Sequence, residues 1–348
     1  MSHRNSLSED LQQQVEQAVE LLKNEDVVGM PTETVYGLAG RIDSPKAIQK
    51  IFHVKERPFF DPLIVHVSSV EQAQKCVADW TPLVATLAAE FWPGPLTLVL
   101  PKADLISDTI TSGLTTVGIR FPKHAIAQAL IEQVGIPLAA PSANKFGRTS
   151  PTTAAHVREE FQKQVFVIDG DSCEIGIEST VLLVKAKTEA PQRYELSVLR
   201  RGAILQSQID SSLKNFHFDY EWVDVIDKKE SPGHMKHHYM PSIPFVICRN
   251  SQMKLSELTQ ILNQRLQELP DVVEGVQMVK PTEAIRKIEF LKLSKSPVQA
   301  AREIYAQLRS ASQRRPDALC LLQMPEHTQE EWQSIFDRLY KAASLIID

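Results

Sequence analysis

Four groups of polar side chains follow or lie within apolar segments of this sequence, at places where they could act on a bound molecule. The first group follows the apolar residues 27–30 and supplies two hydroxyls, a carboxylate and a phenol from Thr32, Glu33, Thr34 and Tyr36. Polar groups gathered at the end of a strand usually bind a ligand. A capped turn from a strand to a helix explains these residues equally well when they are taken alone.

The second group contains Lys55 and Arg57, which stand just before a proline. Two cations held this close together can bind one polyanion. A helix C-terminus whose dipole favours basic residues is the commoner reason for such a pair. Alternation along residues 63–67 places His66 on the face opposite the three apolar residues, where a lone histidine is more often structural.

The third group is centred on Arg120, within the apolar segment 117–121. Alternation places Thr116, Gly118 and Arg120 on one face and the apolar side chains on the other. Burying an arginine there is costly without an anion, and Gly118 leaves room for a ligand to approach the backbone. The anion could equally be a carboxylate of the protein itself.

The fourth group ends a predicted strand with small and hydroxyl-bearing residues and continues to a Ser-Pro helix start. Ala140, Ser142, Asn144 and Ser150 would form a shallow pocket of neutral donors, with a helix N-terminus behind it that favours negative charge. Ser179 and Arg200 add another hydroxyl and another cation.

Some expected phosphate and metal motifs are missing from the sequence. It contains neither a P-loop nor a G-x-G-x-x-G pattern, so any phosphate would be bound by Lys, Arg and hydroxyl side chains. His234, His237 and His238 lie in a polar stretch without a carboxylate or cysteine cluster, so no fixed metal site is expected there.

Length and composition favour an ordinary cytoplasmic protein of two domains. The 348 residues are 43% hydrophobic and 23% charged with a net charge of −5, so RNA binding, if any, would be weak and rest on a local patch. The four cysteines are widely spaced, which argues against structural zinc and disulfides. We expect no signal peptide and no contact with a membrane.

The elements predicted around these groups alternate between strands and helices, and some connections are too short for a crossover. This predicts an α/β domain with a mixed sheet. Its strands are expected at residues 27–30, 63–67, 96–100, 117–121, 137–140, 165–169, 180–184 and 197–199. We predict a first domain at 1–206, an irregular linker at 207–242, and a smaller α/β domain at 243–348.

Taken together, the motifs resemble those of the YrdC-like family. P-T-E-T-V-Y-G-L, K-x-R-P, D-P-L-I-V-H, W-P-G-P-L-T, G-I-R-x-P, A-P-S-A-N, E-S-T and L-R-x-G occur in the family's order between residues 25 and 205. The linker and residues 243–348 resemble the two-domain threonylcarbamoyl-AMP synthases, although less closely than residues 25–205 resemble the YrdC-like family. The resemblance implies a twisted mixed sheet with flanking helices, followed by a smaller Rossmann-like C-terminal domain.

The same resemblance implies a nucleotidyltransferase that makes threonylcarbamoyl-AMP and pyrophosphate from L-threonine, bicarbonate and ATP. The product would pass to a tRNA threonylcarbamoyltransferase complex for N6-threonylcarbamoyladenosine synthesis. Threonine would be bound by Thr34, His66, Arg120, the carbonyl of Ala140 and Ser179. The catalytic cations would be Lys55 and Arg57.

The nucleotide contacts implied by the resemblance are Arg57, Asp61, Thr116, Ser142, Asn144, Ser150, Arg200 and Tyr239. Relatives usually have asparagine where this chain has Asp61. We expect this carboxylate to act through Mg²⁺ that arrives with ATP, and we expect no organic cofactor.

Two other functions stay open. The first is an RNA-binding or regulatory module with the same fold and no catalysis, against which the retained K-x-R and S-A-N motifs argue. The second is a carbamoyltransferase of the hydrogenase-maturation type, whose cysteine-rich zinc fingers have no counterpart in the four scattered cysteines.

Overall fold

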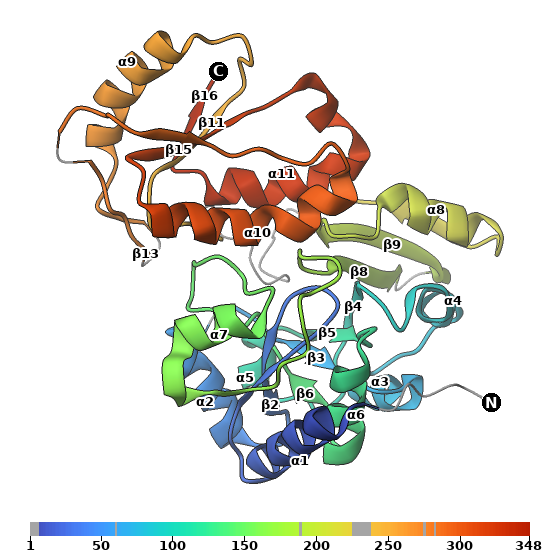
Figure 1. Ribbon diagram of the computed structural model, residues 1–348. Helices are drawn as coiled ribbons and strands as arrows, with labels where there is room; N and C mark the ends of the chain where they lie inside the picture. The colour runs from blue at the N-terminus through green and yellow to red at the C-terminus, as the bar shows by residue number, and fades with distance from the viewer. Residues whose placement is uncertain (1–6, 60, 188–189, 225–237, 274–275, 282) are drawn as a thin grey trace. The chain divides into compact units, whose positions relative to one another are not determined.

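The chain forms two compact units in a computed structural model that describes residues 7–59, 61–187, 190–224, 238–273, 276–281 and 283–348 (Figure 1). The first unit comprises residues 1–145 and 151–234, and the second comprises residues 146–150 and 235–348. Each unit has its own hydrophobic clusters. None of the helices in the described ranges combines the length and the apolar character needed to cross a bilayer.

The first unit is built on a ten-stranded mixed sheet with the order β10-β9-β8-β4-β5-β3-β6-β2-β1-β7. Neighbouring strands are parallel at β10/β9, β8/β4, β5/β3 and β1/β7 and antiparallel elsewhere. The strands are β1 (Val28–Met30), β2 (Gly37–Arg41), β3 (Ile64–His66), β4 (Leu96–Pro101), β5 (Thr116–Arg120), β6 (Leu138–Ala139), β7 (Phe166–Val167), β8 (Thr180–Lys187), β9 (Ala190–Arg200) and β10 (Asp219–Trp222). The predicted mixed α/β sheet is confirmed.

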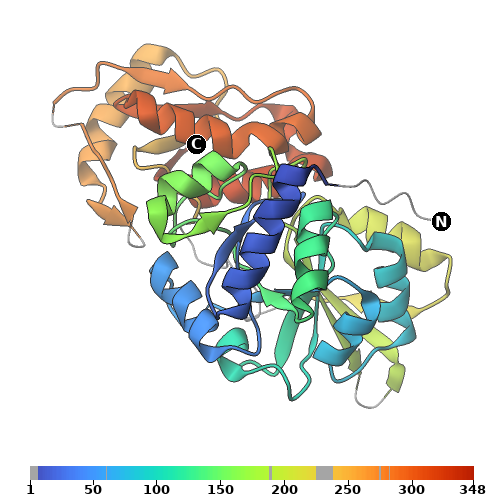
Figure 2. The same ribbon diagram turned by 60° about the horizontal axis from the view of Figure 1, so that its bottom comes forward.

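Helices cover both faces of this sheet. They are α1 (Glu9–Lys23), α2 (Pro45–Lys55), α3 (Val70–Cys76), α4 (Pro82–Phe91), α5 (Asp108–Thr111), α6 (Ala125–Val134), α7 (Ala154–Phe161) and α8 (Gln206–Lys214). Helices α1 and α6 lie side by side and pack on strands β1, β2 and β6 (Figure 2). The larger core, which receives apolar side chains from α2, α3, α4, α7 and α8, lies on the other face.

The alternation of side chains decides which residues of the central strands face this larger core. Leu96, Leu98 and Leu100 of β4 and Val117 and Ile119 of β5 all belong to it. Ile64, Val99, Val181 and Leu183 form a separate small cluster on the opposite face. Thr97, Gly118 and Arg120 alternate with the core residues, so they share that opposite face.

Two segments differ from the sequence prediction. The strand β2 was not among the predicted strands; it begins at Gly37, directly after the turn that follows β1, and pairs with both β1 and β6. Residues 207–242 were expected to be irregular, which is wrong for the first part of this stretch. Ile209 and Leu213 of α8 are buried in the larger core, and β10 extends the sheet beside β9.

The second unit contains a four-stranded parallel sheet with the order β14-β15-β11-β16. Its strands are β11 (Phe245–Cys248), β14 (Ile288–Phe290), β15 (Ala318–Leu322) and β16 (Leu345–Ile347), and a separate pair is β12 (Val272–Val273) with β13 (Val276–Gln277). Its helices are α9 (Leu255–Arg265), α10 (Pro297–Arg314) and α11 (Glu330–Ala342). Helices connect the parallel strands, as expected for a Rossmann-like unit.

Candidate active site

Arg120 is the centre of the polar face of the first unit. It ends β5, is 4% exposed, and donates hydrogen bonds from Nη1 to the Thr34 hydroxyl at 2.8 Å and from Nε to the Gly94 carbonyl at 3.3 Å. Its Nη2 lies 2.7 Å from Oε1 of Glu33. The sequence is compatible with either a ligand or a carboxylate of the protein beside Arg120, and in this structure the carboxylate of Glu33 is beside it.

The hydroxyl groups beside Arg120 form a directed chain. Thr32 donates to the carbonyl of Val35 at 2.6 Å, so in its 2.9 Å contact with Thr34 the proton comes from Thr34. Thr34 therefore donates to Thr32 and accepts from Arg120. This leaves the Thr34 oxygen one further acceptor position.

His66 lies on the strand next to Arg120, because β3 and β5 pair in parallel with His66 in register with Arg120. Its Nδ1 is 3.2 Å from the carbonyl of Ile64, which an N–H at this position would satisfy. Burial and the positive charge of Arg120 lower the pKa of His66 to about 3. The imidazole is therefore neutral at physiological pH and can accept a hydrogen bond at its other nitrogen.

Ser179 and Arg200 lie together beside β4. The Ser179 hydroxyl is 2.7 Å from that of Thr97 and accepts a hydrogen bond from Nη2 of Arg200 at 3.1 Å. Arg200 also donates from Nε to the carbonyl of Ser179 at 3.1 Å. The Gly94 carbonyl accepts a hydrogen bond from Arg120, and the carbonyl of the next residue, Pro95, accepts one from the amide of Thr180. The same turn therefore connects the cluster around Arg120 with the cluster around Ser179.

Lys55 points into the protein and holds the S-A-N segment. Its ammonium group donates to the carbonyls of Ser142 at 2.5 Å and Asn144 at 2.6 Å. Burial lowers the pKa of Lys55 well below its usual value, and the nearby Arg57 lowers it further. The sequence separates these groups by almost ninety positions, yet the structure brings Lys55, Ser142 and Asn144 together.

Arg57 and Asp61 form a buried ion pair directly after α2. Nη2 of Arg57 is 2.8 Å from Oδ2 of Asp61 and donates to the carbonyl of Pro62 at 3.0 Å. Neither carboxylate oxygen of Asp61 has a partner with hydrogen-bond geometry among the described residues. The Asp61 carboxylate is thus buried beside a cation.

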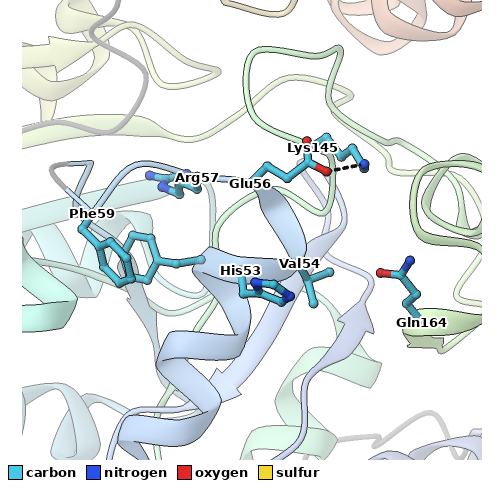
Figure 3. Close-up of a pocket in the computed structure, with 8 residues that line it drawn as sticks. His53, Val54, Glu56, Arg57, Phe59, Lys145 and Gln164 are labelled. Carbon is cyan, nitrogen blue, oxygen red and sulfur yellow. Dashed lines mark hydrogen bonds and ion pairs between the residues drawn. The ribbon is translucent and has the colours of Figure 1, made fainter. Parts of the chain in front are cut away.

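A pocket of about 520 Å³ opens beside Arg57 (Figure 3). The ring of Phe59, which is 60% exposed, stacks on Phe52 at 4.6 Å between centroids. On another side, Lys145 and Glu56 form an ion pair at 2.5 Å. The pocket therefore combines an aromatic surface with charged groups next to the K-x-R motif.

The remaining predicted site residues are buried, and two of them belong to the second unit. Thr116 begins β5. The amide of Ala140 donates to the carbonyl of Ile64 at 3.0 Å, and Ile64 belongs to the same strand, β3, as His66. In the second unit, Ser150 is completely buried, and the Tyr239 ring packs against Tyr305 at 5.5 Å. The carbonyl of Tyr239 accepts from the Thr149 hydroxyl at 3.2 Å.

The described residues contain no group of three or more His, Cys, Asp or Glu side chains that could hold a metal ion. His234 and His237 lie outside the described residues. His238 is 6% exposed and its ring packs edge-on against Tyr239 at 4.1 Å.

Sequence reasoning missed three contributors to this site. Glu33 belonged to a noted motif but was not among the predicted site residues, and Thr97 and Gly94 had no assigned role. Thr97 alternates with the core leucines of β4, which was a usable signal. The partners of Glu33 and Gly94 are distant in sequence, so no local pattern identified them.

The comparison with known proteins decides the family. Residues 20–202 match the family model described as telomere recombination, and residues 204–344 match the one described as threonylcarbamoyl-AMP synthase, C-terminal domain. The chain belongs to the threonylcarbamoyl-AMP synthase family. The family resemblance inferred from the motifs is confirmed, and so is the expectation of an enzyme of this kind.

Two relatives and a solved structure support membership of the threonylcarbamoyl-AMP synthase family. The synthase of Bacillus subtilis (strain 168) is 36% identical over 335 residues, which cover 95% of this chain and 93% of that protein. The synthase of Pyrococcus abyssi is 37% identical over 253 residues, or 72% of each protein. The crystal structure of P. abyssi Sua5 complexed with L-threonine matches 96% of each chain with a TM-score of 0.76 and 30% identity.

Proposed function

We propose that this protein joins L-threonine, bicarbonate and ATP to form threonylcarbamoyl-AMP and pyrophosphate. The observation that carries the proposal is the buried cluster of Arg120, Thr34 and His66 on the polar face of the sheet. It offers a cation, a hydroxyl and a neutral imidazole, which suit a small hydroxylated amino acid. The similar P. abyssi protein was crystallised with L-threonine, which supports this reading.

Each threonine contact follows from the chemistry of the group. Arg120 would bind the carboxylate, because a guanidinium matches its planar geometry. Thr34, Ser179, the carbonyl of Ala140 and neutral His66 would bind the hydroxyl and amino groups. These neutral groups accept or donate single hydrogen bonds, which makes them selective for a hydroxylated side chain over an apolar one of equal size.

Lys55 and Arg57 would stabilise the transfer to the nucleotide. The carbamate on threonine attacks the α-phosphate, and pyrophosphate leaves with growing negative charge, which fixed cations offset. Arg200 would add a third cation, while Thr116, Ser142, Asn144, Ser150 and Tyr239 would surround the nucleotide. No nucleophilic side chain is required, so positioning and electrostatics supply the catalysis.

Magnesium would accompany ATP at Asp61. The carboxylate fits this role because it is buried and neither oxygen accepts a hydrogen bond from the described residues, while Oδ2 lies 2.8 Å from Nη2 of Arg57. Oxygen ligands are those that Mg²⁺ prefers, and one or two carboxylates with substrate phosphates commonly hold it. The ion would neutralise phosphate charge, and we propose no organic cofactor.

The product would serve tRNA modification in the cytoplasm. A mixed anhydride of AMP is an activated acyl donor, so we propose that a threonylcarbamoyltransferase complex consumes it on tRNA. RNA contacts of this protein itself would be weak, given the net charge of −5. All four cysteines are free and buried, which is compatible with a reducing compartment.

The test is direct detection of the product. Purified protein is incubated with L-threonine, ¹³C-bicarbonate, ATP and Mg²⁺, and mass spectrometry should detect labelled threonylcarbamoyl-AMP together with pyrophosphate. Arg120→Ala and the omission of threonine are the controls and should yield neither. If wild-type protein binds RNA specifically but forms no threonylcarbamoyl-AMP, the non-catalytic module is the correct function.

A further inference from the structure

Glu33 and Arg120 form a charge pair that is incomplete as an internal salt bridge. Oε1 of Glu33 lies 2.7 Å from Nη2 of Arg120, and the two side chains are 3% and 5% exposed. Yet both carboxylate oxygens and this Nη2 lack a partner with hydrogen-bond geometry among the described residues. Buried charged groups normally satisfy such positions, and leaving them unsatisfied is costly. The Glu33 carboxylate and Nη2 of Arg120 therefore lie side by side, with hydrogen-bonding capacity that the described residues do not use.

The surrounding chain holds this pair in place without using this capacity. The backbone carbonyls of Glu33 and Thr34 accept hydrogen bonds from the amides of Ile175 at 2.8 Å and Gly176 at 3.1 Å. Arg120 is anchored through Nη1 and Nε, at Thr34 and Gly94. The carboxylate of Glu33 and Nη2 of Arg120 are thus prepositioned to bind a small molecule.

A molecule that carries an anion and a cation on one carbon matches this arrangement, and an amino acid is such a molecule. We propose that Glu33 is a catalytic residue that binds the α-ammonium group of the amino acid substrate, while Arg120 binds its carboxylate, and that Glu33 removes a proton from the ammonium group. This inference rests on the proposed function.

The proton has to leave because an ammonium group has no lone pair. Glu33 takes one proton, and the free amine then attacks the carbon of bicarbonate. An N–C bond forms, a C–O bond breaks, and the departing hydroxide takes a second proton from nitrogen to leave as water. The substrate becomes a carbamate, R–NH–CO₂⁻, so one proton in total remains on Glu33 and must pass to solvent.

The other titratable groups near the substrate are poorly suited to this step. Burial and the charge of Arg120 lower the pKa of His66 to about 3, because a proton on its imidazole would place a second buried cation beside the guanidinium. Burial raises the pKa of Cys173 to about 12, so this neighbour of Glu33 remains a thiol. The hydroxyls of Thr34 and Ser179 are not bases at neutral pH.

In this proposal His124 passes the proton towards solvent. It is only partly buried, and its Nδ1 has no hydrogen-bond partner in the described ranges. Burial lowers the pKa of His124, while the charge of Glu33 raises it, as do Asp171 and Glu174. The charged and titratable groups near Glu33 are therefore Arg120, His124 and Cys173, and the charges of Asp171 and Glu174 act on His124.

The first test is the pH profile of Glu33→Gln in the full-length chain. Asp169→Asn, which removes an exposed carboxylate that is paired with Arg158 and has no role in the proposed step, is the control. Without its base, Glu33→Gln should lose kcat at pH 7 by about a hundredfold, the lower end of general-base contributions. Its kcat should then rise about tenfold per pH unit towards pH 9 with the fraction of free amine, while wild type and control stay nearly flat. A profile parallel to that of wild type would overturn the proposal.

The second test is binding, which does not depend on turnover. Calorimetry compares L-threonine with 3-hydroxybutanoate, which is threonine without its ammonium group. Glu33→Gln should lose at least about tenfold in threonine affinity, equal to about 1.4 kcal/mol, and should bind 3-hydroxybutanoate more tightly than wild type does. Unchanged affinities for both ligands would contradict the proposal. A wild-type protein that forms no threonylcarbamoyl-AMP would refute the proposed function, while these affinities would still decide the role of Glu33.

Thermal melting and ATP binding check that the variant is folded. If Glu33→Gln does not fold, Glu33→Asp replaces it, because it keeps the charge and withdraws the carboxylate by one methylene. Weaker threonine binding and lower kcat with unchanged ATP affinity are then expected. Wild-type values for Glu33→Asp would overturn the proposal.

Discussion

Arg57 and Asp61 form a buried ion pair, in which Nη2 lies 2.8 Å from Oδ2 and the side chains are 5% and 1% exposed. An unopposed carboxylate about 5 Å from a phosphate would weaken nucleotide binding by about 3 kcal/mol at an effective dielectric near 20. Because Arg57 is in contact with Asp61, this repulsion is largely offset. Arg57 therefore lies beside Asp61 even before ATP arrives with Mg²⁺.

Asp61→Asn should leave an active enzyme that requires more free Mg²⁺. The amide keeps the shape of the side chain but is a weaker ligand for the ion, so the half-maximal Mg²⁺ concentration should rise about tenfold, equal to about 1.4 kcal/mol. Rate is measured against free Mg²⁺ for both proteins. Glu56→Gln, an exposed carboxylate of the same loop, should behave as wild type. An unchanged Mg²⁺ requirement combined with tighter ATP binding would mean that Asp61 only repels the phosphates.

Arg120→Ala should abolish activity through threonine and not through ATP. Losing the partner of a bound carboxylate should cost about 2–5 kcal/mol of threonine binding, because its charge would lie buried and unpaired. ATP affinity measured without threonine should stay near that of wild type. A large loss of ATP affinity would refute the assignment of Arg120 to threonine.

Arg120→Ala should also lower the free energy of unfolding, because it removes the cation beside the buried Glu33 carboxylate. Removing one member of a buried pair typically costs about 3–5 kcal/mol. The double variant Arg120→Ala/Glu33→Gln should regain much of this loss, because no buried charge is left unpaired, yet it should not bind threonine. Urea unfolding of the two variants measures the difference. Equal stability of the single and double variants would show that the pair is not coupled.

His66 should make the free energy of unfolding depend on pH. Its pKa is lowered to about 3 in the folded protein against an ordinary value of 6.5, so between these values the unfolded chain binds the proton and the folded one does not. Stability is therefore complete above about pH 6.5 and falls as the pH decreases towards 3. Between pH 6 and 4, wild type should lose up to about 1.4 kcal/mol per pH unit more than His66→Gln. Identical slopes would show that His66 is not buried in its neutral form.

Shortened chains should reveal where the first unit ends. A chain of residues 1–224 keeps Ile209 and Leu213, which are fully buried in the larger core, whereas a chain of residues 1–206 loses both. Burying each side chain contributes about 1.5–3 kcal/mol, so the longer chain should unfold at a higher urea concentration. Neither chain should make threonylcarbamoyl-AMP, because both lack Tyr239. Full activity of residues 1–224 would show that Tyr239 is dispensable.

The sequence alone determined which face of the central strands would be polar. In β5, strict alternation separates Val117 and Ile119 from Gly118 and Arg120, and the structure has this arrangement. The order of the motifs also identified the family, because each motif is local. Strand β2 escaped prediction, since Gly-Leu-Ala-Gly carries almost no propensity and becomes a strand only through pairing with β1 and β6.

The partners of the charged side chains were decided only by the tertiary structure. Whether Arg120 meets a ligand or a carboxylate was open in the sequence, because Glu33 is 87 positions away along the chain and only the sheet brings the two together. The same holds for Lys55, whose bonds to Ser142 and Asn144 span 87 and 89 residues. Alternation along a strand reports the direction of a side chain, but contact between distant segments depends on strand order, which no local pattern contains.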